Sequence, residues 1–69
     1  MNTETWIPQT DGVNVWAINS RTGSIRRYCA GTRSPVLSVY AIGEEVAIVT
    51  EDGRTRAWNP TTDGSRTFL

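Results

Sequence analysis

"VNVWAINSRTGS", residues 13–24, and "RTRAWNPTTDGS", residues 54–65, share one plan: a short strand runs into a glycine turn and then into a second strand. A tryptophan lies inside each stretch, although the two tryptophans miss a common shift by one place. We interpret the two stretches as copies of one internal repeat. Two turn pairs coincide at a shift of 41 residues: Asp-Gly at 11–12 and 52–53, and Gly-Ser at 23–24 and 64–65.

The rest of the chain continues the same pattern. Helical periodicity is missing, and short runs rich in valine, isoleucine, tyrosine and tryptophan alternate with turn signals, which is typical of strands and hairpins. Asp-Gly is a strong hairpin signal, because glycine accepts a positive φ without a Cβ clash. Such short connections join antiparallel neighbours, so the sequence predicts an all-β antiparallel meander. The predicted strands lie at about 5–10, 13–18, 24–29, 35–42, 45–51, 54–59 and 65–68.

The repeat resembles a known architecture. "VNVWAINSRTGSIRRY" resembles the closing hairpin of a WD-repeat blade, and residues 34–64 are similar to the first three strands of a WD or quinoprotein-type blade. Periods of about 40–45 residues with four strands each are typical of propeller blades. The resemblance implies one blade-like domain over residues 1–69, with a partial repeat at 5–28 and a full repeat at 34–69. Ala17 and Asn59 depart from the aspartate that usually follows the tryptophan of a WD blade.

The predicted strands carry apolar residues on both faces. One full blade and three further strands are too little to close a ring, since propellers have four to eight blades. Strands that are apolar on both faces are covered on both faces. We therefore predict a homo-oligomer that completes the repeat, and a compact monomeric barrel or sandwich stays open as the alternative. Strict alternation in 35–42 places Val36, Tyr40 and Ile42 on one side and Leu37, Val39 and Ala41 on the other.

The composition excludes several kinds of chemistry. The chain has no histidine and a single cysteine, Cys29, so it has no intrachain disulfide, no zinc site of the usual ligands and no histidine base. We interpret Cys29 as a packed small hydrophobe, and the acidic pairs at 44–45 and 51–52 as solvated hairpin ends. The sequence therefore predicts a protein that is not an enzyme and that uses no cofactor or metal.

Aromatic and arginine side chains are the candidates for binding. A tryptophan in a strand most often belongs to a core or an interface, and its functional interpretation is a platform for a sugar or a base. We expect Trp16 to lie near Arg26 or Tyr28 across a hairpin, where the three would form a cationic aromatic surface. No acidic residue lies between Asp11 and Glu44. The predicted ligand-binding residues are Trp6, Trp16, Arg26, Tyr28 and Trp58, and the predicted anion-binding residues are Arg21, Arg27 and Arg33.

These features favour a non-enzymatic binding module, a homo-oligomeric protein–protein interaction or structural β protein. The first alternative is a carbohydrate-binding oligomer, because small fucose-binding lectins, which build propellers from two-repeat chains that trimerise, resemble this pattern. The second is nucleic-acid binding through Arg21–Arg33, which a net charge of zero disfavours. No apolar run is long enough to cross a membrane, and the first ten residues lack the features of a signal peptide. We therefore expect a cytoplasmic protein.

Overall fold

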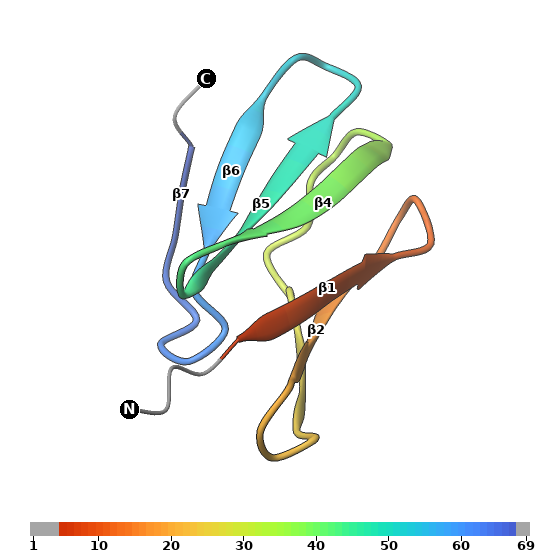
Figure 1. Ribbon diagram of the computed structural model, residues 1–69. Coiled ribbons are helices and arrows are strands. Elements are labelled where there is room, and N and C mark those ends of the chain that lie inside the picture. Colours follow the sequence, from red (N-terminus) through yellow and green to blue (C-terminus); the bar gives the residue numbers. More distant parts are fainter. Residues whose placement is uncertain (1–4, 68–69) are drawn as a thin grey trace.

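The computed structural model describes residues 5–67, which form two antiparallel β-sheets and no helix (Figure 1). Strands follow one another in chain order within each sheet, and neither sheet closes into a barrel. The prediction of an all-β antiparallel chain is confirmed, and so is the meander within each sheet. The three-stranded sheet contains β1 (Trp6–Thr10), β2 (Val15–Asn19) and β3 (Ile25–Arg27), and the four-stranded sheet contains β4 (Val36–Ile42), β5 (Glu45–Thr50), β6 (Thr55–Trp58) and β7 (Ser65–Thr67).

The β2–β3 and β6–β7 hairpins have the same turn. In each turn an asparagine Oδ1 atom accepts the backbone N–H groups of the residues two and three places further on. The residue four places after that asparagine donates its N–H to the asparagine carbonyl and has a positive φ. Asparagine is favoured here because its side chain hydrogen-bonds the backbone ahead of it. The two asparagines are Asn19 and Asn59, and the positive-φ residues are Gly23 (φ 77°) and Asp63 (φ 62°).

Hydrogen bonding relates these hairpins by forty residues, the separation of Asn19 and Asn59, and not by the 41 of the letter match. The cross-strand pairs agree with this shift, since Ala17 pairs with Arg26 just as Ala57 pairs with Arg66. A change of one residue exchanges the two faces of a strand. The shift of forty therefore decides which faces of the two sheets correspond.

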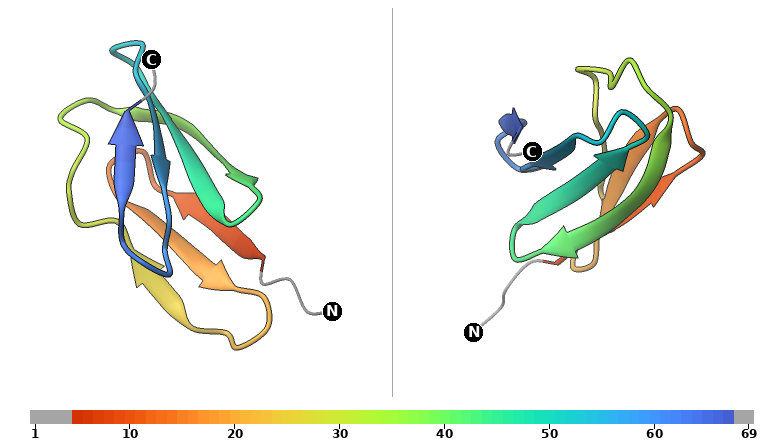
Figure 2. Two further views of the ribbon diagram at one scale, coloured as in Figure 1. Left: turned by 90° about the vertical axis from the view of Figure 1, so that its left-hand side faces the viewer. Right: turned by 90° about the horizontal axis from the view of Figure 1, so that it is seen from above.

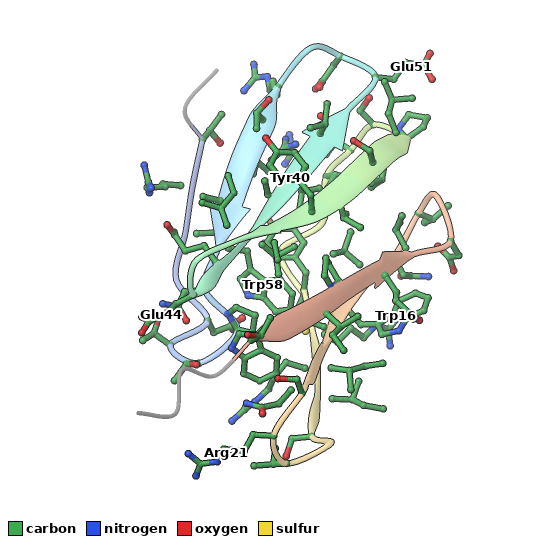
Figure 3. All side chains as sticks on the ribbon, viewed as in Figure 1. Trp16, Arg21, Tyr40, Glu44, Glu51 and Trp58 are labelled. Atoms are coloured by element: carbon green, nitrogen blue, oxygen red, sulfur yellow. The ribbon has the colours of Figure 1, made fainter. Side chains whose placement is uncertain are left out.

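The core lies where the two sheets stack on each other. Trp58 has no exposed surface, and its ring meets the ring of Tyr28 edge to face, with centroids 5.4 Å apart. The indole Nε1 donates a hydrogen bond of 2.9 Å to the Asp63 carboxylate. Figure 3 shows Trp58 between the sheets. The three-stranded sheet contributes Trp6, Val15, Ala17 and Tyr28, and the four-stranded sheet contributes Val36, Val46, Ile48 and Trp58.

Strand β4 does not alternate strictly, because a β-bulge interrupts its pairing with β5 between Val36 and Ser38. A bulge adds a residue to one strand and shifts the alternation beyond it. Val36 is buried in the core and Val39 packs against the same core. The prediction that these two valines lie on opposite sides is therefore wrong. Tyr40 and Ile42 lie beyond the bulge and stay exposed.

Residues 28–35 connect the two sheets along the side of the molecule (Figure 2). At the end of this segment the Val36 N–H donates to the carbonyl of Gly12, in the β1–β2 turn, over 2.8 Å. The Arg56 guanidinium donates to the Thr32 carbonyl over 3.3 Å and to the Thr50 hydroxyl over 3.1 Å. These bonds fix the segment against both sheets.

The turn geometry yields a test with an internal control. Gly23→Ala should lower the free energy of unfolding by about 1 kcal/mol, because Gly23 has a φ of 77° and an L side chain in that region is strained. Gly64→Ala should be neutral or slightly stabilising, since the φ of Gly64 is not positive and a Cβ there meets only the Thr62 hydroxyl at 3.4 Å. Urea denaturation followed by tryptophan fluorescence measures both. Equal losses in the two variants would contradict the turn assignment.

Candidate functional site

Three of the predicted ligand-binding aromatics lie in the core. Trp6, Tyr28 and Trp58 are all buried between the sheets. A side chain with no exposed ring offers no stacking platform to a sugar or a base, so their position agrees with the core interpretation of strand tryptophans. Trp16 differs, because it lies half-buried on the outer side of the three-stranded sheet (Figure 3).

The cationic aromatic pair has a different partner from the one predicted. Trp16 lies directly opposite Arg27 on β3 and opposite Gln9 on β1. Arg26 pairs with Ala17 instead, and alternation places it on the other side of the sheet. The expectation that Trp16 faces Arg26 or Tyr28 is therefore wrong, because the β2–β3 register is one residue away from the assumed one.

Two of the three predicted anion-binding arginines line neighbouring hollows. One hollow of about 450 Å³ is lined by Arg33, and one of about 270 Å³ is lined by Arg27. The two share the lining residues Val13 and Asn14 from the β1–β2 turn, and Gly31 and Thr32 from the connecting segment. Arg21 lies apart from them in the β2–β3 turn (Figure 3). The structure thus divides the predicted arginine patch.

A short polar chain supports this arginine pair. The Asp11 carboxylate accepts the N–H of Asn14 over 2.7 Å, the N–H of Val13 over 2.9 Å and the Asn14 side-chain amide over 3.2 Å. These bonds lower the pKa of Asp11 from 3.8 to about 2. The Asn14 Oδ1 in turn accepts a bond of 3.2 Å from Arg27. Asp11 therefore holds Asn14, which positions the Arg27 guanidinium at the edge of the hollow.

The other residues singled out by their chemistry are dispersed. Glu44 and Glu51 lie in turns at opposite ends of β5 (Figure 3), and the neighbouring Glu45 accepts a 3.1 Å bond from Arg66. Cys29 is exposed, so its interpretation as a packed hydrophobe is wrong, since β3 ends at Arg27 and leaves Cys29 outside the sheet. Within residues 5–67 no group of three or more potential metal ligands comes together. The same residues contain no helix with the length and apolar character to span a bilayer.

The analysis by residue type missed two apolar surfaces on the outer sides of the sheets. On the three-stranded sheet, Ile7, Ile18 and Ile25 form one cross-strand row, and Ile25 is 66% exposed. On the four-stranded sheet, Tyr40 and Ile42 are 45% and 50% exposed. Alternation along β1 and β2 carries the signal for the first surface, because each isoleucine there follows or precedes a buried residue.

Comparison of the chain with family models, curated proteins and solved structures gave no match.

The pKa of Asp11 predicts how stability depends on pH. Its pKa in the folded chain is about 2, below the ordinary 3.8, so the unfolded chain binds more protons as the pH falls. The stabilising contribution is complete above the ordinary pKa and is lost as the pH falls from about 3.8 towards about 2. Asp11→Asn should flatten the loss of stability over this range, measured by urea midpoints at stepped pH.

Asp52 provides the matched comparison for this test. A hydrogen bond from the Thr50 hydroxyl lowers the pKa of Asp52 in the other hairpin, so Asp52→Asn should remove a separate part of the same slope. A pH profile of Asp11→Asn that superimposes on that of the unchanged protein would show that the Asp11 bonds do not persist in solution.

Proposed function

We propose that this chain is a non-catalytic binding module that works as a homo-oligomer, a protein-interaction or structural β protein made of blade-like sheets. The observation that carries the proposal is the pair of apolar outer surfaces. Monomeric soluble proteins rarely expose contiguous apolar patches of more than a few hundred Å², and burying such surface contributes about 25 cal/mol per Å². The exposed large apolar side chains within the strands are Ile7, Ile25, Leu37, Tyr40 and Ile42.

The arrangement of the sheets supports the blade-like part of the proposal. Each sheet is an antiparallel meander in chain order, and the two sheets stack face to face. Their last two strands form equivalent hairpins with the same turn bonds. Units that repeat and stack in this manner bury a continuous core only when further units follow, because each contacts its neighbours alone.

The solution mass tests this function. Light scattering at micromolar concentration should give a multiple of the 7.6 kDa chain mass, and the mass should fall on dilution. Stable association of this kind buries about 800 Å² on each partner. A constant 7.6 kDa at every concentration, together with a full strand signal in circular dichroism, would overturn the proposal.

A sugar-binding role is the second candidate, and the pairing of Trp16 with Arg27 favours it. Both side chains lie on the outer side of the three-stranded sheet, where an aromatic ring beside a fixed donor suits a monosaccharide. A panel of monosaccharides should then shift the tryptophan fluorescence of the protein but not of Trp16→Phe. No shift with any sugar in the panel would rule this role out and leave the oligomer proposal unaffected.

A further inference from the structure

The equivalence of the two hairpins fixes which sides of the two sheets correspond. We call the side that carries Ala17 or Ala57 the front of its sheet, and the opposite side, which carries Ile18 or Trp58, the back. Ala17 and Ala57 are equivalent because both follow the shift that relates Asn19 to Asn59 and both pair with an arginine of the next strand. Successive side chains of a strand point to opposite faces, so the remaining residues follow from the pairing.

Within the chain, a front packs on a back. Ala17 of the three-stranded sheet and Trp58 of the four-stranded sheet both have no exposed surface and belong to one core. Pro8, which pairs with Ala17, is on the front of its sheet, and Ile48, which pairs with Arg56, is on the back of the other. The two sheets are therefore arranged head to tail, so one further sheet could be added at each end by the same contact.

The two outer surfaces are the ends of this arrangement. The outer side of the four-stranded sheet is a front, with Tyr40 beside the small residues Ala47 and Ala57 in one cross-strand row. The outer side of the three-stranded sheet is a back. Its Ile18 takes the place that the buried Trp58 has in the other sheet, and Trp16 lies on the same side. One free front and one free back remain on each chain.

We propose that the front of the four-stranded sheet of one copy packs on the back of the three-stranded sheet of the next copy. The occupant is a second copy of this chain, because the pair of faces that would meet already packs inside each chain, with bulky back residues over a front of small ones. The inference rests on the proposed function, since it names the surfaces through which copies join. Such a heterologous contact produces a ring if the rotation closes and a filament if it does not.

Two variants block one surface each. Tyr40→Lys with Ile42→Lys places charge on the front, and Ile7→Lys with Ile25→Lys places charge on the back. All four residues are at least 45% exposed, so their replacement should leave the fold intact. Val13→Lys is the matched control, because Val13 is 76% exposed and lies in the β1–β2 turn outside both surfaces. Ile42→Lys alone replaces the front variant if that variant loses its strand signal.

Each blocked variant alone should have the mass of one chain, 7.6 kDa, while Val13→Lys associates like the unchanged protein. An equimolar mixture of the two blocked variants should form a dimer of twice the chain mass, because one supplies the free front and the other the free back. A back-blocked variant that dimerises alone, or a mixture that stays monomeric, would overturn the head-to-tail contact while self-association of the unchanged protein stands. An unchanged protein that stays monomeric would remove both proposals.

Discussion

The burial of Trp58 between the two sheets is the contact on which the rest of the fold depends. A three-stranded sheet of short strands has little stability in water unless one face is covered. Tyr28, at the end of the three-stranded sheet, reaches the Trp58 ring. The indole N–H can be buried because Asp63 accepts its hydrogen bond. Asp63 takes up a positive φ in the turn where the first hairpin has Gly23, so the residue that completes the turn also satisfies the core.

The strands and turns could be predicted from the sequence because their causes are local. Glycine and asparagine mark each reversal, and β-branched or aromatic residues fill the segments between them. The shift between the repeats could not be obtained in the same way. The letters match at Gly64, whereas the structure places Asp63 at the position of Gly23. A residue type indicates that a turn is present, but the backbone hydrogen bonds decide its register.

The face on which a side chain lies was harder to predict than the strand that contains it. The bulge between Val36 and Ser38 has no signature in the letters, and it brings Val36 and Val39 to one core. The candidate site was affected for the same reason, since a register one residue away replaced Arg26 by Arg27 beside Trp16. Burial of Trp6 and Trp58 depends on the stacking of the sheets, which no single strand encodes.

The same stacking gives the free surfaces their character. A sheet inside a stack needs a front and a back that differ, because each must fit the unlike face of its neighbour. Ala17 and Ala57 keep the two fronts flat, and Trp58 and Ile18 make the two backs bulky. Sheets that met through identical faces would need only one apolar side each. An apolar surface on both sides of both sheets, small on one and bulky on the other, is what a continuing stack requires.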